Sequence, residues 1–176
     1  AETDLQQVEI YSLLITQYTL TGLYEQAVNS GRKALQLLGI ELPASDIEGH
    51  YRREEAIVQR ELSKISTNAL LDRPEMTSAE KHAALLVLTS LNAAGMYTYR
   101  PLYYLVVTKK VQLCLEYGHS PESSFAYVSF GVPLASNGEH LKQALELGMM
   151  ARELSRKWDR FDIRCKVNFI LGTYIL

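Results

Sequence analysis

The sequence lacks an excess of charge of either sign. Its 176 residues include 18 lysine and arginine residues and 20 aspartate and glutamate residues, which gives a formal net charge of −2. A nucleic-acid-binding domain needs a clearly basic face to neutralise phosphates. The basic pairs Arg52-Arg53 and Lys109-Lys110 are isolated, and acidic residues lie near them. The composition therefore predicts that no nucleic acid is a partner.

The sequence also lacks a long apolar run. No stretch reaches the length of about 18 apolar residues that a helix needs to cross a bilayer. The first four residues, Ala-Glu-Thr-Asp, lack the basic and apolar regions of a signal peptide. We therefore expect no membrane partner and no export signal.

Cysteine is scarce. Cys114 and Cys165 are the only two, and both lie within apolar helical patterns. A disulfide is the alternative, but 47% of the residues are apolar and a chain of this length can bury an adequate core without one. We interpret both cysteines as free and buried, which favours a reducing, cytoplasmic location.

What the sequence does contain is helical periodicity. Apolar residues recur at spacings of three and four in about eight segments of roughly 15 to 20 residues, joined by short connections. No alternating pattern typical of a strand is found. The sequence therefore predicts an all-α fold, a superhelix of antiparallel helix pairs in one domain over residues 1–176. The expected pairs span residues 4–39, 46–97, 101–137 and 139–176.

Several helix ends are predicted from capping residues and glycines. Ser45 with Glu48 and Thr77 with Glu80 have the spacing of capping boxes. The first of these helices is expected to run on to residue 69, with Val58, Leu62, Ile65 and Ala69 on its buried face. Further breaks are predicted at Gly39, at Gly118, at Ser120-Pro121 as a cap with a first-turn proline, and at Asn137-Gly138 as a turn.

The first helix pair has the pattern of a tetratricopeptide repeat, a unit of about 34 residues with bulky residues on one helix and small residues where the helices cross. Ala27 and Gly31 would let the two helices approach closely. A second match runs from Ser123 to Lys157, and Phe169, Leu171 and Gly172 resemble the start of a third unit. The bulky positions of the first unit are Tyr11, Leu14, Ile15 and Tyr18.

Three strings extend this likeness to a particular helical region. They are QYTLTG at 17–22, ALQLLGIELP at 34–43 and LEYGHSPESSFAY at 115–127. This region resembles one in large bacterial signalling proteins that combine a serine/threonine kinase, an AAA or STAND-like ATPase, a GAF domain and a sensor histidine kinase. The resemblance covers most of the chain but rests on packing motifs. It implies a regulatory or scaffolding segment, to which no catalytic residue can be transferred.

The apolar, uncapped end of the sequence, Ile170 to Leu176, favours a piece of a longer protein. We expect the parent to be a protein kinase or ATPase. This piece contains no glycine-rich phosphate loop and no kinase motif. We therefore expect no catalytic residue and no cofactor here.

The histidines and the one serine–lysine motif offer little chemistry. His50, His82, His119 and His140 lie at no metal-ligand spacing, so we interpret them as surface or capping residues and expect no metal site. Ser78 and Lys81 have the spacing of some acyl-transfer enzymes. Ser78 also stands where a helix cap belongs, and capping is the interpretation we prefer.

One aromatic cluster is a candidate contact surface. Tyr97, Tyr99, Arg100 and Tyr103 lie together in the sequence, and tyrosine and arginine are common anchors of protein interfaces. The alternative, which the sequence alone favours, places Tyr103 or Tyr104 in the core and the others between helix pairs.

The sequence leaves three functions to compare. The first is a non-catalytic interaction module that binds proteins or peptides, in particular neighbouring domains of the same chain. The second is a module that senses a ligand or peptide and controls an adjacent ATPase or kinase. The third, an enzyme, lacks a nucleophile, a base and an oxyanion site in the sequence.

Overall fold

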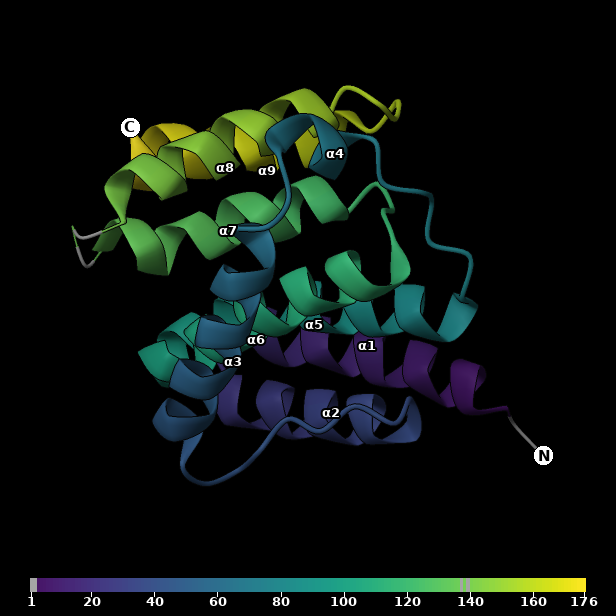
Figure 1. The fold of residues 1–176 in the computed structure, drawn as a ribbon. Coiled ribbons are helices and arrows are strands. Elements are labelled where there is room, and N and C mark those ends of the chain that lie inside the picture. Colours follow the sequence, from purple (N-terminus) through teal and green to yellow (C-terminus); the bar gives the residue numbers. More distant parts are fainter. Residues whose placement is uncertain (1–2, 137, 139) are drawn as a thin grey trace. The chain divides into compact units, whose positions relative to one another are not determined.

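The structure, a computed structural model, describes residues 3–136, 138 and 140–176. These residues form nine α-helices and a π-helical turn that continues the last of them (Figure 1). The all-α fold class is thereby confirmed. The helices are α1 (Asp4–Leu20), α2 (Tyr24–Leu37), α3 (Ile47–Leu62), α4 (Thr67–Leu71), α5 (Ala79–Thr98), α6 (Arg100–Tyr117), α7 (Ser123–Ser136), α8 (Leu141–Leu154) and α9 (Phe161–Ile170), followed by η1 (Leu171–Ile175).

The chain divides into two compact units. Unit one comprises Ala1–Ile57 and Thr77–Lys109, and unit two comprises Val58–Met76 and Lys110–Leu176. Helices α3 and α6 each contribute to both units. Within the described ranges, none of the helices combines the length and the apolar character that a membrane span requires.

Unit one is built on the α1–α2 hairpin. The chain reverses at Gly22, whose φ of 76° suits a residue without a side chain. Helix α5 packs against both α1 and α2. A Cβ atom added at Gly31 of α2 would collide with the Leu91 side chain of α5, so glycine at this position lets the two helices approach. Val8, Ile15 and Ala27 lie in the resulting core.

Unit two is built in the same way on α7 and α8. Helix α9 and η1 pack against both of these helices. A Cβ atom at Gly148 of α8 would lie 2.6 Å from Leu171, and one at Gly131 of α7 would lie 2.8 Å from Ile175. Helix α7 is buried over most of its length even though it contains Pro133.

Several predicted helix ends differ from the structure. The N-cap of α5 is Ser78, whose hydroxyl accepts a hydrogen bond from the Lys81 amide at 3.3 Å, so the prediction of Thr77 was wrong by one residue. Helix α3 begins at Ile47 and ends at Leu62. The predicted continuation to Ala69 was also wrong, because Ser66 caps a separate helix, α4. Ala69 is therefore exposed, and Ile65 is only half-buried.

The start of α7 also differs from expectation. It begins at Ser123, after a turn that contains Ser120 and Pro121, because the Ser123 hydroxyl accepts a hydrogen bond from the Ser120 amide at 2.9 Å. Gly118, with a φ of 95°, ends α6 as predicted. Of the predicted Asn137-Gly138 turn, Asn137 lies outside the described residues.

The segment after α4 is fixed to the end of α6 by backbone hydrogen bonds. The His119 amide donates to the Pro74 carbonyl, and the His119 carbonyl accepts from the Met76 amide, both at 2.8 Å. This isolated bridge is the only β-type pairing in the described part of the chain.

Candidate protein-contact surfaces and a buried polar cluster

A stacked pair of tyrosines marks the surface of unit one. Tyr24, at the start of α2, and Tyr97, near the end of α5, have ring centroids 5.0 Å apart and ring planes at 21° to each other. The packing of α5 on α2 brings these two residues together, and Tyr97 is 69% exposed. The pair lines a shallow hollow of about 340 Å³ with Gly22, Leu23 and Thr98.

The four residues predicted as a contact surface separate into two groups. Tyr97, Tyr99 and Arg100 are exposed at the connection between α5 and α6. Tyr103 is a core residue, with 2% of its surface exposed. A Cβ atom at Gly95 would lie 3.3 Å from the Tyr103 backbone, so α5 and α6 approach closely here.

Tyr24 belongs to the same surface but was not predicted from the sequence. Its position within the apolar stripe of the second helix favoured a core position. The available signal was its place two residues after Gly22, at the first position of the helix, where a side chain is often only partly covered. We use the name tyrosine surface for Tyr24, Tyr97, Tyr99 and Arg100.

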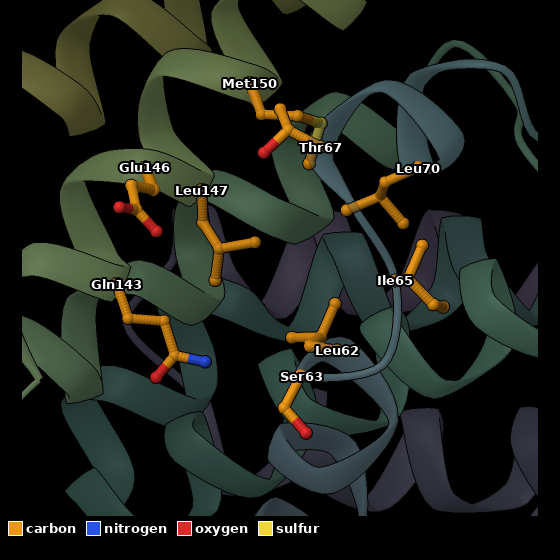
Figure 2. Close-up of a pocket in the computed structure, with 9 residues that line it drawn as sticks. All are labelled: Leu62, Ser63, Ile65, Thr67, Leu70, Gln143, Glu146, Leu147 and Met150. Atoms are coloured by element: carbon orange, nitrogen blue, oxygen red, sulfur yellow. The ribbon is translucent and has the colours of Figure 1, made fainter.

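Unit two contains a groove between the α3–α4 connection and α8. It has a volume of about 250 Å³, and Figure 2 shows the side chains around it. Apolar side chains and hydroxyl, amide and carboxylate groups share its wall in comparable parts. The lining residues are Leu62, Ser63, Ile65, Thr67, Leu70, Gln143, Glu146, Leu147 and Met150.

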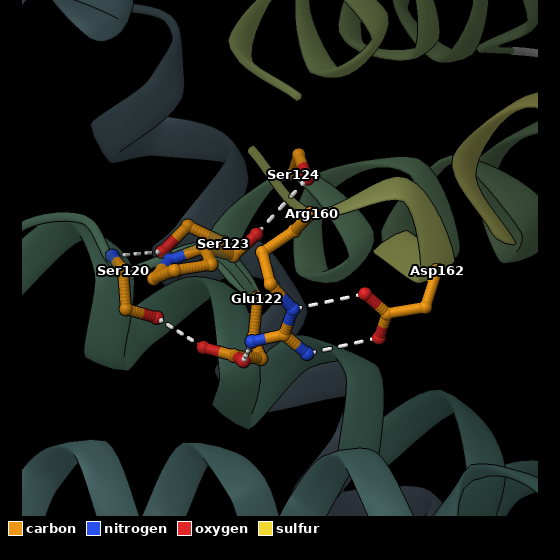
Figure 3. A network of polar contacts seen from close by, with 7 residues as sticks. Ser120, Glu122, Ser123, Ser124, Arg160 and Asp162 are labelled. Atoms are coloured by element: carbon orange, nitrogen blue, oxygen red, sulfur yellow. Dashed lines mark hydrogen bonds and ion pairs between the residues drawn. The ribbon is translucent and has the colours of Figure 1, made fainter. Parts of the chain in front are cut away.

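A polar network connects the starts of α7 and α9 (Figure 3). Glu122 accepts hydrogen bonds from the Ser120 hydroxyl at 3.0 Å and from the Arg160 guanidinium at 3.1 Å. Arg160 also donates to both carboxylate oxygens of Asp162, at 2.8 and 2.9 Å. Hydrogen bonding to Arg160 lowers the pKa of Asp162 to about 2. The Arg160–Asp162 pair therefore stays charged over the physiological pH range.

His119 lies in the interior of unit two, so its interpretation as a surface or capping residue was wrong. Its Nε2 atom is 2.9 Å from the Tyr127 hydroxyl, and the two rings meet edge to face. Its Nδ1 atom is buried without a hydrogen-bond partner. Burial, and to a smaller extent the positive charges of Arg73 and Lys157, lower the pKa of His119 to about 4.

The two cysteines are both free, but only Cys114 is buried as predicted. Its thiol donates a hydrogen bond to the Ser123 hydroxyl at 3.2 Å. Burial raises the pKa of this thiol to about 12, so it is protonated at neutral pH and is a poor nucleophile. Cys165 is exposed on α9, so the prediction of burial was wrong for this residue.

Lys110 is a fully buried lysine, although in the sequence it belongs to an isolated basic pair. Its amine lies 4.5 Å from the centroid of the Phe125 ring, and burial lowers the pKa of the amine to about 7. Its neighbour Lys109 contacts Glu54 at 2.9 Å. Because consecutive residues on a helix point in different directions, the two lysines have different surroundings.

The hydrogen bond between Cys114 and Ser123 does not activate the thiol. The Cys114 thiol is protonated, and its hydrogen-bond partner is Ser123 rather than a base. No group of three or more histidine, cysteine, aspartate or glutamate residues that could hold a metal ion is found among residues 3–136, 138 and 140–176. These polar contacts connect helix ends, so we assign them to stability.

Comparisons with protein-family models, with curated proteins and with solved structures gave no match.

Proposed function

We propose that this chain is a non-catalytic protein-interaction and regulatory module built of tetratricopeptide-like helix pairs. The observation that carries the proposal is the repetition of one packing scheme in both units. In unit one α5 packs on the α1–α2 pair, and in unit two α9 with η1 packs on the α7–α8 pair. Successive helix pairs that pack in this way build extended binding surfaces.

The repetition extends to single residues. Gly31 lies on α2, the second helix of unit one. It faces Leu91 of α5, the helix that packs on the α1–α2 pair. Gly148 lies on α8, the corresponding helix of unit two, and faces Leu171 of η1, which packs on the α7–α8 pair. Because glycine permits close approach of a leucine side chain in both places, the two units use equivalent contacts. This equivalence supports a repeat rather than two unrelated helical bundles.

The tyrosine surface is the contact site that we propose for the partner. Tyr24, Tyr97 and Tyr99 present aromatic area on the outside of unit one, and Arg100 adds a cation beside them. Large aromatic groups and arginine dominate the energy of protein interfaces. The partner we propose is a protein or peptide, in particular a neighbouring domain of a longer cytoplasmic chain.

The resemblance to bacterial multidomain signalling proteins suggests what the contact does. In a parent of this kind, with its own kinase and ATPase domains, the module would hold the ATPase in an inactive state or transmit a signal to the kinase end. The module itself would contribute contacts and no catalysis.

A binding experiment tests the tyrosine surface. The neighbouring ATPase and kinase domains of the proposed parent are produced separately and titrated with this chain by calorimetry. Replacement of Tyr97, Tyr99 and Arg100 by alanine should weaken binding at least about tenfold, because each anchor is worth roughly 1–2 kcal/mol. Leu86→Ala, on an exposed position of α5, is the matched control. Unchanged binding by a folded triple variant would contradict the proposal.

The groove of unit two supports a second candidate, a ligand- or peptide-sensing module. Its wall combines apolar side chains with hydrogen-bonding groups that could orient a ligand, and its volume of about 250 Å³ suits a small one. A metabolite library would be screened by thermal shift, since a ligand stabilises the fold by RT ln(1 + [L]/Kd). Leu147→Trp should fill the groove and abolish any shift. Absence of a shift for every compound would favour the protein-contact proposal.

A further inference from the structure

A hollow of about 280 Å³ lies between the end of α8 and α9 in unit two, and arginine is prominent in its wall. Arg152, in the last turn of α8, and Arg156, just past its end, lie one turn apart on one side. From α9 come Phe161, Arg164 and Cys165, which share a face because the second and third lie three and four residues after the first. The described lining contains no acidic side chain.

Positive charge is concentrated in this part of a chain whose net charge is −2. Residues 152–166 include six lysine and arginine residues but only three acidic residues. Two of these three already have partners, because Glu153 pairs with Arg156 at 2.7 Å and Asp162 pairs with Arg160 at 2.8 Å. The local excess of cations is therefore not neutralised by the acidic residues beside them.

Two of the lining arginines have no carboxylate partner. Within residues 3–136, 138 and 140–176, neither Arg152 nor Arg164 takes part in an ion pair. Arg152 lies at the end of α8, where the helix dipole favours a cation. Arg164 is the fourth residue of α9, so close to the helix start that the dipole disfavours a cation. The helix dipole therefore does not account for Arg164.

The charge of the hollow favours a dianion as its occupant. Like charges around one hollow repel each other, and an anion among them removes the repulsion. Because Arg156 is paired with Glu153, Arg152 and Arg164 leave two positive charges without a counterpart. A phosphate monoester carries a charge of about −1.5 to −2 at pH 7, and its three acceptor oxygens can contact guanidinium groups from two helices at once. A carboxylate carries a single charge, and one arginine can occupy both of its oxygens.

An aromatic side chain lies beside these charges. The Phe161 ring is 72% exposed and belongs to the wall of the hollow, and the Arg164 guanidinium lies 5.9 Å from its centroid. Since one water takes about 30 Å³ of liquid volume, a phosphate group of five heavy atoms would fill only part of the hollow. The remaining space and the ring suit a phosphate that is attached to an apolar carrier.

We propose that the hollow between α8 and α9 is a binding site for phosphate monoesters. Arg152 and Arg164 hold the phosphate group, and Phe161 contacts the group that carries it. Small organic phosphates and phosphorylated side chains of a protein both supply this chemistry. The site shares no residue with the tyrosine surface, so the failure of one proposal leaves the other intact.

Calorimetric titration of the full 176-residue chain with phenyl phosphate tests the proposal. The dissociation constant should be below about 1 mM. Benzoate, which presents a carboxylate on the same ring, should bind at least about tenfold more weakly. Inorganic phosphate should also bind more weakly, because it lacks the carrier. A short peptide with phosphotyrosine distinguishes the two sources, since tighter binding than phenyl phosphate would indicate a phosphorylated protein.

Charge variants locate the site. Arg152→Gln and Arg164→Gln should each weaken the binding of phenyl phosphate at least about tenfold. Lys142→Gln is the matched control, because it removes an exposed cation about 15 Å away along α8, and it should change the affinity less than about twofold. Cys165→Glu should abolish binding, because it places a carboxylate in the hollow. Melting curves would verify that each variant is folded.

Three results would overturn the proposal. The first is the absence of saturable binding of phenyl phosphate up to about 10 mM. The second is equal binding of benzoate, which would make the site one for carboxylates. The third is an equal loss of affinity in Lys142→Gln and Arg164→Gln, or unchanged binding in folded Cys165→Glu, because either result would place the ligand outside the hollow.

Discussion

Arg160 and Glu122 form an ion pair that connects the start of α9 to the start of α7, with 3.1 Å between Nη1 and Oε1. The Glu122 side chain is only 4% exposed, while that of Arg160 is 44% exposed. The two partners are therefore unequal. Loss of Arg160 leaves a carboxylate in the interior, where it is poorly solvated.

Replacement of Arg160 by alanine should destabilise unit two by about 1–3 kcal/mol, less than the full cost of breaking a buried pair because Arg160 itself is partly solvated. The measurement is urea unfolding at pH 7. Arg156→Ala, which removes an exposed pair with Glu153, is the control and should change stability by less than about 0.5 kcal/mol. Equal effects of the two replacements would mean that burial of Glu122 has no energetic consequence.

Acidification should destabilise the protein through His119. Burial lowers the pKa of this residue from 6.5 to about 4, so between these values the unfolded chain binds a proton that the folded chain does not. This contribution to stability is complete above pH 6.5 and is lost as the pH falls to 4, by about 2–3 kcal/mol in total. Denaturant midpoints measured from pH 7 to pH 4 would show the loss.

The matched variant for this prediction is His119→Gln. It should be less stable than the unmodified chain at pH 7 because its amide fits the contact with Tyr127 less well, by about 1 kcal/mol. It should also lose less stability on acidification. His50→Gln, which removes a half-buried histidine, serves as the control. An unchanged slope in His119→Gln would show that another group causes the acid sensitivity.

Two glycines with positive φ should differ in their tolerance of alanine. Gly39 has a φ of 69° and open space where alanine would place its Cβ atom, so Gly39→Ala should cost about 1 kcal/mol for the left-handed conformation alone. At Gly118, with a φ of 95°, a Cβ atom would also collide with the Pro74 carbonyl. Gly118→Ala should therefore cost more than about 2 kcal/mol. Thermal unfolding of the two variants would measure the difference.

Adjacent lysines on α6 should respond in opposite directions to replacement by methionine. Burial lowers the pKa of Lys110 from 10.5 to about 7, so this residue reduces stability as the pH falls from 10.5 to 7. Lys110→Met should remove that loss and raise stability at pH 7 by about 1–3 kcal/mol.

Lys109→Met should instead lower stability by about 1–3 kcal/mol, because it leaves the largely buried Glu54 carboxylate without its cation. Urea unfolding at pH 7 and pH 10 distinguishes the two. If Lys110→Met were less stable than the unmodified chain at pH 7, the buried amine would be a net source of stability.

The helical fold could be predicted from the sequence because the apolar spacing along α2, α3 and α8 is regular. In addition, Gly22, Gly39 and Gly118 end helices through their backbone conformation. The end of α3 at Leu62 and the separate helix capped by Ser66 were harder to predict from the sequence. Leu62, Ile65 and Ala69 keep helical spacing across the break, and only a serine that bonds to the backbone reveals it.

The burial of the polar residues His119 and Glu122 could not be predicted from the sequence. His119 and Glu122 lie in a polar string, His-Ser-Pro-Glu-Ser-Ser, that is typical of an exposed turn. Buried Glu122 pairs with Arg160, which is distant in the sequence, and buried His119 contacts Tyr127. Tyr97 and Tyr99 are exposed and flank the helix end at Thr98, whereas the sequence favoured a position between helix pairs for them. The burial of Tyr103 depends on a close helix crossing at Gly95 that spacing alone does not reveal.

The contrast between the two cysteines makes the chain a convenient reporter of its own contacts. Cys114 is buried and protonated, whereas Cys165 is exposed on α9, in a hollow that Arg152, Arg156 and Arg164 also line. A thiol-reactive fluorophore should therefore attach at one position in the native protein without any mutation. Its emission would change whenever another molecule covers this face of α9, so occupancy could be followed in real time.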